Sequence, residues 1–236
     1  MVLPRPVSAV VFDMDGLLVD TEVVYRDAMA AVAQEMGHVM SMDVFKAMIG
    51  LPDNTRLLTG CYGADFPVPA FNARVVELAD AMIAQGLDLK PGVLEMLDHL
   101  DEIGLPRAIA TSSSHRAVAS HLGASGVIPR FHTIVAKGDY ARGKPHPDPY
   151  LTAATRLGIA PELCLALEDS HNGVRSASAA GMMTVMVPDL LDPTDEMHEL
   201  CVRIAADLHE VRGWLAGLNG LSSPLGGGGP RSGGGG

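Results

Sequence analysis

The sequence is short of positive charge. It has 17 lysines and arginines against 28 aspartates and glutamates, which gives a formal net charge of −11 at pH 7. The basic residues are scattered and form no stripe that could follow a nucleic-acid backbone or an anionic membrane surface. We therefore expect neither nucleic acid nor a membrane as a partner.

Long apolar runs and a cysteine framework are missing too. No stretch reaches the roughly eighteen apolar residues that a membrane helix needs, and the N-terminal segment lacks the layout of a signal peptide, so we expect a cytoplasmic protein. The three cysteines, Cys61, Cys164 and Cys201, are far apart and form no CxxC pair, which indicates neither a disulfide framework nor a zinc site. We interpret them as small buried hydrophobic residues.

What the sequence does have is a regular alternation of apolar runs and helix-like segments. Hydrophobic residues make up 47% of the 236 residues, which is enough for a buried core. Strands that alternate with helices are typical of a parallel sheet covered on both faces, so the pattern predicts an α/β fold. The five predicted strands are 8–12, 107–111, 132–136, 163–167 and 184–187.

One long segment interrupts this alternation. From Glu22 to about Gly86 the spacing of alanine, methionine and valine is helical, and no convincing strand is present. We predict an α/β core from residues 1–21 and 90–216, with a helical unit inserted at 22–89. Residues 217–236 are glycine-rich, so we predict a flexible tail there.

The strongest chemical signal is FDMDGLLVDTE at 12–22, directly after the first strand. In an extended chain, residues i and i+2 share a face, so the carboxylates of Asp13 and Asp15 point into one crevice. Two such close carboxylates repel each other unless a cation lies between them, and magnesium is a hard cation that prefers oxygen ligands.

The other strand ends carry matching groups. Thr111 ends the second predicted strand and is followed by Ser112 and a helix start, where hydroxyl and amide groups can bind an anion. Lys144 precedes a proline-rich helix start, and Glu168 with Asp169 ends the fourth predicted strand. Each motif alone is commonly a turn or a helix cap. All of them at the same edge of one sheet predict a single site.

These four motifs resemble those of the haloacid dehalogenase-like hydrolase superfamily, and the similarity covers residues 8–216. The resemblance implies a Rossmann-like parallel sheet with an inserted helical cap. It implies a magnesium-dependent phosphatase that acts on a small phosphomonoester, such as a sugar phosphate, through an aspartyl-phosphate intermediate.

The resemblance also implies roles for individual residues. Asp13 is the nucleophile and a magnesium ligand, and Asp15 is the general acid and base, with its backbone carbonyl on the metal. Thr111 and Ser112 bind the phosphoryl oxygens, Lys144 neutralises the nucleophile and the phosphate, and Asp169, helped by Glu168, holds magnesium. Substrate selection is expected in the cap, where Asn54 and Arg56 are candidates, together with Arg26 and Lys46.

Two alternatives stay open. β-Phosphoglucomutases share these motifs, but they typically carry a histidine where this chain has Tyr25, which favours water as the acceptor. A non-catalytic regulatory protein is disfavoured because no motif position is degraded, and Asp15 disfavours a dehalogenase. The histidines match no zinc pattern, and we interpret them as surface or packing residues: His115, His121, His146 and His171.

Overall fold

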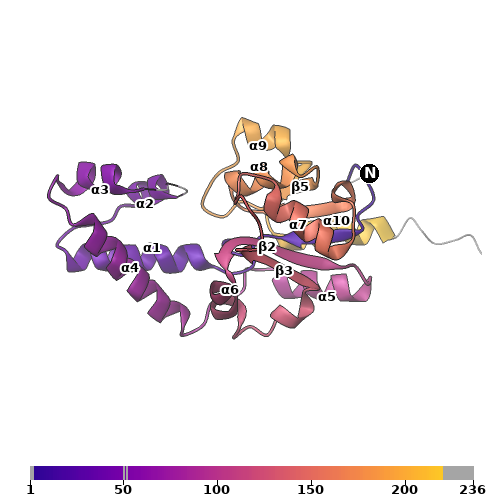
Figure 1. Cartoon of the computed structure of the whole chain (residues 1–236), viewed down its shortest axis with the longest axis horizontal. Coiled ribbons are helices and arrows are strands. Elements are labelled where there is room, and N and C mark those ends of the chain that lie inside the picture. The colour runs from indigo at the N-terminus through magenta and orange to yellow at the C-terminus, as the bar shows by residue number, and fades with distance from the viewer. Residues whose placement is uncertain (1–2, 50, 52, 220–236) are drawn as a thin grey trace, which may run out of the picture.

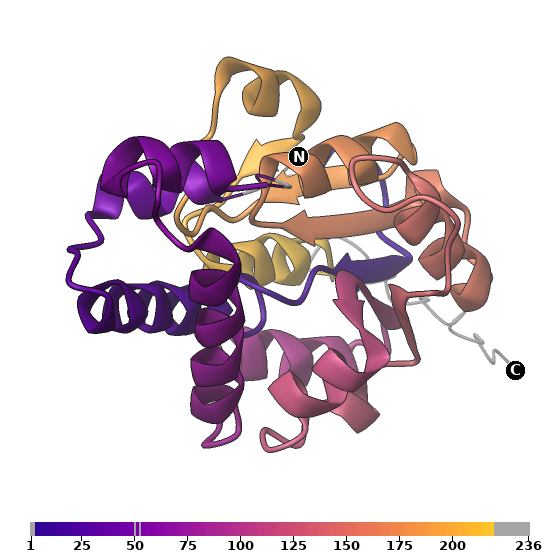
Figure 2. The same cartoon turned by 60° about the vertical axis from the view of Figure 1, so that its left-hand side comes forward.

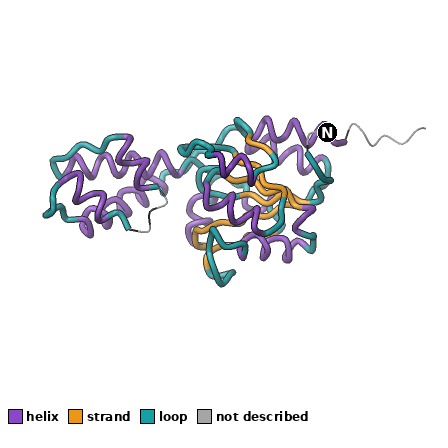
Figure 3. Tube along the Cα trace, turned by 90° about the horizontal axis from the view of Figure 1, so that it is seen from above, coloured by secondary structure: helices purple, strands orange, loops and turns teal. Residues whose placement is uncertain are grey.

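The computed structural model describes residues 3–49, 51 and 53–219. They form two units, a sheet covered by helices and a purely helical unit, which lie side by side in Figures 1 and 2. In Figure 3 the strands are confined to the first unit. No described helix is both long enough and apolar enough to cross a membrane.

The sheet has six parallel strands in the order β3-β2-β1-β4-β5-β6. Their bounds are β1 Ala9–Phe12, β2 Arg107–Ser114, β3 Thr133–Lys137, β4 Cys164–Glu168, β5 Met183–Met186 and β6 Arg203–Ile204. The predicted α/β class with a Rossmann-like parallel sheet is confirmed. Two differences are larger than one residue: β2 continues three residues beyond Thr111, and β6 was not predicted.

Helices cover both faces of the sheet because the strands are apolar on both sides. In β1, Val10 and Phe12 pack into one core cluster, whereas Ala9 and Val11 pack into another. The first cluster includes side chains of α5 Val93–Glu102, α6 His115–Leu122 and α10 Leu208–Asn219. The second includes side chains of α7 Asp148–Leu157 and α8 His171–Ala179. Three shorter helices complete this unit: η1 Ile128–Arg130, η2 Pro161–Leu163 and α9 Asp195–Leu200.

The helical unit follows β1 and consists of α1 Thr21–Glu35, α2 Met42–Met48, α3 Thr55–Tyr62 and α4 Val68–Ile83. It has its own hydrophobic core, in which Val32, Leu58 and Phe71 are buried. A separate core means that the unit can pack around its own residues while the sheet packs around others. This helical insertion after β1 matches the helical spacing of the sequence.

Two expectations at the surface were wrong. Cys61 is exposed on α3, whereas Cys164 is buried as expected. Helix α10 continues to Asn219, so the first three residues of the predicted flexible tail are helical. The rest of that predicted tail, 220–236, lies outside the described residues.

Candidate active site

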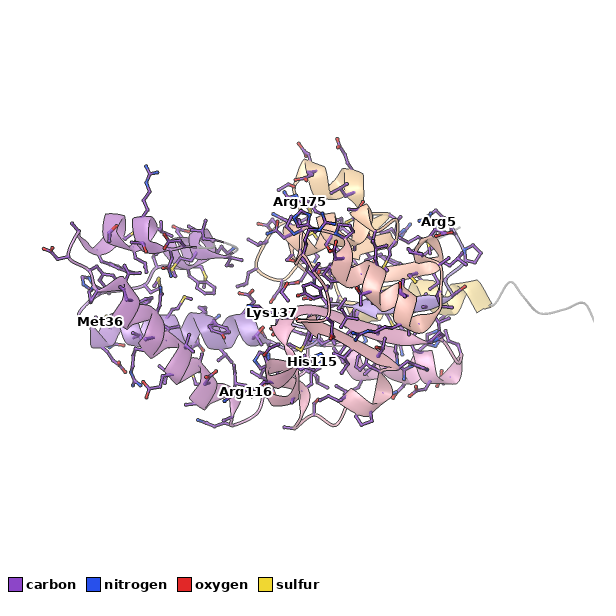
Figure 4. All side chains as sticks on the ribbon, viewed as in Figure 1. Arg5, Met36, His115, Arg116, Lys137 and Arg175 are labelled. Atoms are coloured by element: carbon purple, nitrogen blue, oxygen red, sulfur yellow. The ribbon has the colours of Figure 1, made fainter. Side chains whose placement is uncertain are left out.

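Three acidic side chains meet where β1 and β4 end. The two strands are neighbours, with Phe12 opposite Leu167, so the residues that follow them emerge side by side. Asp13, Glu168 and Asp169 are all buried, and each places one carboxylate oxygen within 4.8 Å of the others. The carboxyl end of the sheet faces the helical unit, and Figure 4 labels His115 and Lys137, which follow or end β2 and β3, on this side.

This arrangement penalises negative charge. The pKa of Asp13 is raised to about 7, chiefly by burial and also by the charges of Glu168 and Asp15, which together outweigh the lowering effect of Lys144. Burial, followed by the charges of Glu168 and Asp13, raises the pKa of Asp169 well above its usual value. The Oδ1 atom of Asp169 is buried and has no hydrogen-bond partner among the described residues. Clustered carboxylate oxygens with an unsatisfied buried acceptor are a donor set that fits magnesium.

Two glycines make room for these acids. A Cβ atom at Gly173, in α8, would lie 1.8 Å from the Cδ atom of Glu168. A Cβ atom at Gly16 would lie 2.2 Å from Oδ2 of Asp169, and Gly16 has a φ of +82°, which other residues rarely adopt. Glycine at both positions allows the backbone to approach the acidic cluster closely.

Lys144 supplies positive charge to the cluster. Its Nζ atom donates to Oδ1 of Asp13 and to Oε1 of Glu168, at 2.5 Å in each case. Burial disfavours the charged amine, but Asp13 and Glu168 outweigh it and raise the pKa of Lys144. Glu168 also accepts from the hydroxyl of the fully buried Tyr150 at 2.7 Å and from Ser170 Oγ at 3.0 Å. The single ammonium group therefore bridges two of the three acids.

Asp15 lies apart from the acidic cluster. Its Oδ2 atom accepts a hydrogen bond of 2.7 Å from Ser113 Oγ, and its Oδ1 atom is 2.9 Å from Nδ1 of His121. The carboxylate faces a pocket rather than the three acids. The side chain of Asp15 therefore does not belong to the acidic cluster, and a contribution of its backbone carbonyl to a metal site stays a prediction.

The interpretation of His121 as a surface or packing residue was correct only in part, because its burial fits packing but its contact with Asp15 was not predicted. Its side chain is buried and contacts Asp15. The sequence held a signal for this, because His121 follows Val118 at helical spacing and precedes Leu122, and both of these are buried. A histidine on the buried face of a helix needs a polar partner, and this helix follows the strand that ends at the site. Ser113 was also not identified as a site residue.

The residues after β2 differ from the predicted arrangement. Thr111 is buried at the site, with its Oγ1 atom 3.5 Å from Oδ2 of Asp15. Ser112 is exposed. Helix α6 begins only at His115, and its N-terminal amide groups are capped by Ser114, whose side chain accepts from the amide of Ala117. The predicted helix is present in this segment, but β2 first continues to Ser114.

A pocket of about 380 Å³ lies between the sheet and the helical unit. Asp15, Ser113 and His121 line it from the sheet side, and Asn54 lines it from the helical unit. Arg56 does not line it and is exposed, so the structure does not bring this predicted substrate ligand to the site. The remaining lining residues are Thr21, Glu22, Tyr25, Met29, Phe45, Met48, Ile49 and Leu51.

Comparison with known families gives a match to the model described as haloacid dehalogenase-like hydrolase over residues 10–187. Among curated relatives, the phosphorylated carbohydrates phosphatase of Thermotoga maritima is 32% identical over 177 residues, which are 74% of this chain and 82% of that protein. Hexitol phosphatase B of Escherichia coli is 31% identical over 202 residues, which are 80% of this chain and 86% of that protein.

Comparison with solved structures gives the same architecture. The crystal structure of a HAD family hydrolase from Deinococcus radiodurans, with bound phosphate and sodium, superposes with a TM-score of 0.79 at 29% identity. The match covers 92% of this chain and 98% of that one, so both the sheet unit and the helical unit have counterparts there.

Proposed function

The chain belongs to the haloacid dehalogenase-like hydrolase family, and from that premise we propose that it is a phosphatase that hydrolyses a small phosphomonoester through an aspartyl-phosphate on Asp13. One observation supports this most: Asp13 is buried against Lys144, while Asp15, two residues later, faces the pocket. A nucleophile and a separate acid are the two groups that this reaction needs.

In the first half-reaction, a carboxylate oxygen of Asp13 attacks phosphorus, and the bond from phosphorus to the ester oxygen breaks. Lys144 favours the carboxylate form of Asp13 against the effect of burial, and it offsets the negative charge of the phosphoryl group. Thr111, and Ser112 beside it, bind phosphoryl oxygens. The protonated carboxyl group of Asp15 gives its proton to the departing alkoxide, which is otherwise a poor leaving group.

In the second half-reaction, Asp15 acts as a base. Its carboxylate accepts a proton from water, the water oxygen attacks the aspartyl-phosphate, and inorganic phosphate leaves while the Asp13 carboxylate is restored. Ser113 and His121 hold the Asp15 carboxyl group at the pocket wall, from which it can reach both the leaving group and the water. One residue therefore serves both steps.

A magnesium ion would be held by Asp13, Asp169 and Glu168, together with the backbone carbonyl of Asp15. It would supply positive charge that stabilises the transferring phosphoryl group. This fits the surplus of buried acids over the single ammonium group of Lys144.

Water, rather than a second sugar hydroxyl, is the proposed phosphoryl acceptor. Tyr25 lines the pocket near Asp15, in the place where the mutases typically carry a histidine. The two relatives compared above are named as a phosphorylated carbohydrates phosphatase and a hexitol phosphatase. We therefore place the substrate among small phosphorylated metabolites of this kind.

The test is release of inorganic phosphate from p-nitrophenyl phosphate and a panel of sugar and polyol phosphates, with magnesium and with a chelator. We expect metal-dependent release that falls at least about 1,000-fold in Asp13→Asn. Asp65→Asn, which changes an exposed loop carboxylate, is the matched control and should keep full activity. Equal activity in Asp13→Asn would contradict the mechanism, and isomerised sugar phosphate without phosphate release would indicate the mutase instead.

A further inference from the structure

The pocket beside Asp15 has an apolar wall on the side of the helical unit. Five of its lining side chains are apolar, and they come from α1, from α2 and from the residues after α2: Met29, Phe45, Met48, Ile49 and Leu51. Phe45 and Met48 are buried, and Met48 and Met29 also pack in the core of the helical unit, which holds this wall in place. A leaving group that emerges from the phosphoryl site would lie against it.

Apart from His121, whose Nδ1 atom is paired with Asp15, the charged groups of the pocket are all of one sign. Asp15 and Glu22 are acidic, and the described lining residues include no lysine or arginine. Lys46, which lies between two lining residues in α2, is exposed, and so is Arg56 in α3. The charge of Lys144 is taken up by Asp13 and Glu168, outside this pocket.

The polar groups that remain can bind hydroxyl groups. The carboxylate of Glu22 accepts hydrogen bonds, the amide of Asn54 both donates and accepts, and Tyr25 offers a phenolic hydroxyl. Asn54 is held in place by a pair of hydrogen bonds with Asn72, at 2.9 and 3.0 Å. None of these groups compensates a second negative charge.

From this lining, and resting on the proposed phosphatase function, we propose that the pocket selects substrates whose leaving group is neutral and hydroxylated, and rejects those that carry a second phosphate or a carboxylate. An anion in this pocket would lose water without gaining a counter-ion and would face Glu22. Hydroxyl groups would meet acceptors and donors, and the carbon skeleton would meet the apolar wall.

Substrate pairs with the same carbon skeleton test this directly. The value of kcat/KM is compared for fructose 1-phosphate and fructose 1,6-bisphosphate, and for glycerol 3-phosphate and 3-phosphoglycerate. In each pair, we expect the member that carries a second phosphate or a carboxylate to have a kcat/KM at least tenfold lower. Equal values within both pairs would overturn the proposal. Hydrolysis of p-nitrophenyl phosphate that is lost in Asp13→Asn would show, in that case, that the phosphatase function itself still holds.

Two charge changes locate the effect in this pocket. Glu22→Gln removes the negative charge with little change of shape, and Ile49→Lys adds a positive charge to the apolar wall. Both should raise the bisphosphate-to-monophosphate ratio of kcat/KM at least tenfold, while the neutral control Ile49→Met should leave that ratio unchanged. Because the readout is a ratio, a general loss of activity in a variant does not affect it. An unchanged ratio in both charge variants would contradict the assignment.

Discussion

At the scale of single residues, Gly173 is required by its contact with Glu168. A Cβ atom would lie 1.8 Å from the Cδ atom of Glu168, a carboxyl group that also holds Lys144 and Tyr150. We expect Gly173→Ala to lower the free energy of unfolding by about 1–3 kcal/mol, as overpacking of a core does, and to reduce kcat strongly. Urea unfolding and phosphate release measure the two effects.

The matched control is Gly60→Ala in α3. Gly60 is also helical, but a Cβ atom there would meet open space. Because alanine has the higher helix propensity, this change should stabilise the protein by about 0.5–1 kcal/mol and leave kcat unchanged. If the two substitutions had the same effect, the contact with Glu168 would not be the reason for glycine at position 173.

His121 positions the proposed acid, Asp15, through a 2.9 Å hydrogen bond. His121→Leu should lower kcat for alkyl phosphates by about tenfold or more, with little change in KM. His121→Gln keeps a hydrogen-bonding group, so its kcat should lie between those of His121→Leu and the native chain. The loss should be smaller for p-nitrophenyl phosphate, because nitrophenolate leaves without full protonation. An equal loss for both kinds of substrate would mean that His121 supports the fold and not the acid.

Most of the site residues that could be predicted from the sequence lie at or near the end of a strand. Asp13, Thr111 and Asp169 follow apolar runs, so simple topology brings them together. The contacts of His121 and Ser113 with Asp15 could not be predicted in this way, because they depend on how far β2 continues before α6 begins. That detail is decided by packing and not by local pattern.

At the scale of secondary-structure elements, Asp139 ties β3 to two helices. Its Oδ2 atom is 2.9 Å from Nε2 of His115 in α6 and accepts from Arg156 in α7 at 3.1 Å and from the amide of Ala136 at 3.0 Å. Arg156 and these other donors lower the pKa of Asp139 to about 2. The carboxylate is therefore bound more favourably in the folded chain than in the unfolded chain.

This shift has a defined sign. The folded-state pKa is below the ordinary value of 3.8, so the stabilisation is present above about pH 4 and is lost as the pH falls from about 4 to about 2. Asp139→Asn should lower the free energy of unfolding by about 1 kcal/mol at pH 7, and the difference from the native chain should shrink below pH 4. Urea unfolding at pH 7, 5 and 3 measures it, with the exposed Asp65→Asn as control. If the difference in the free energy of unfolding between the variant and the native chain did not depend on pH, the charge of Asp139 would not be the source of the stabilisation.

Element boundaries were predicted less well than element types. The sheet was expected from five apolar runs, and each of them overlaps a strand. The sixth strand, Arg203–Ile204, has only two residues, too few for a periodic pattern to be visible. Likewise α10 continues into the glycine-rich region to Asn219, because Trp214 and Leu215 pack on the sheet and extend the helix.

At the scale of the whole molecule, the sequence predicts two units but not the space between them. Helical spacing identifies the insertion, and its residues do form a core of their own. The pocket, however, combines Glu22 and Tyr25 in α1 with Asn54 just before α3 and His121 in the sheet unit. Such a combination depends on how the units pack, which is why Asn54 and Arg56 were equal candidates in the sequence and only Asn54 lines the pocket.

The molecule as a whole should be stabilised by magnesium. Three buried acids face one ammonium group, and Oδ1 of Asp169 lacks a partner among the described residues. A ligand at 100 times its dissociation constant stabilises a folded protein by about 2.7 kcal/mol, so we expect magnesium to raise Tm by about 5–10 °C. Sodium chloride at matched ionic strength controls for screening.

Asp169→Asn separates binding of the ion from a general effect of salt. The substitution removes one of the buried like charges, so the metal-free variant should be at least as stable as the metal-free native chain. It also removes a carboxylate ligand, so most of the magnesium-induced rise in Tm should disappear. A rise of the same size in Asp169→Asn, measured by thermal unfolding under identical conditions, would mean that the ion binds elsewhere, because the buried acids would then not be what holds it.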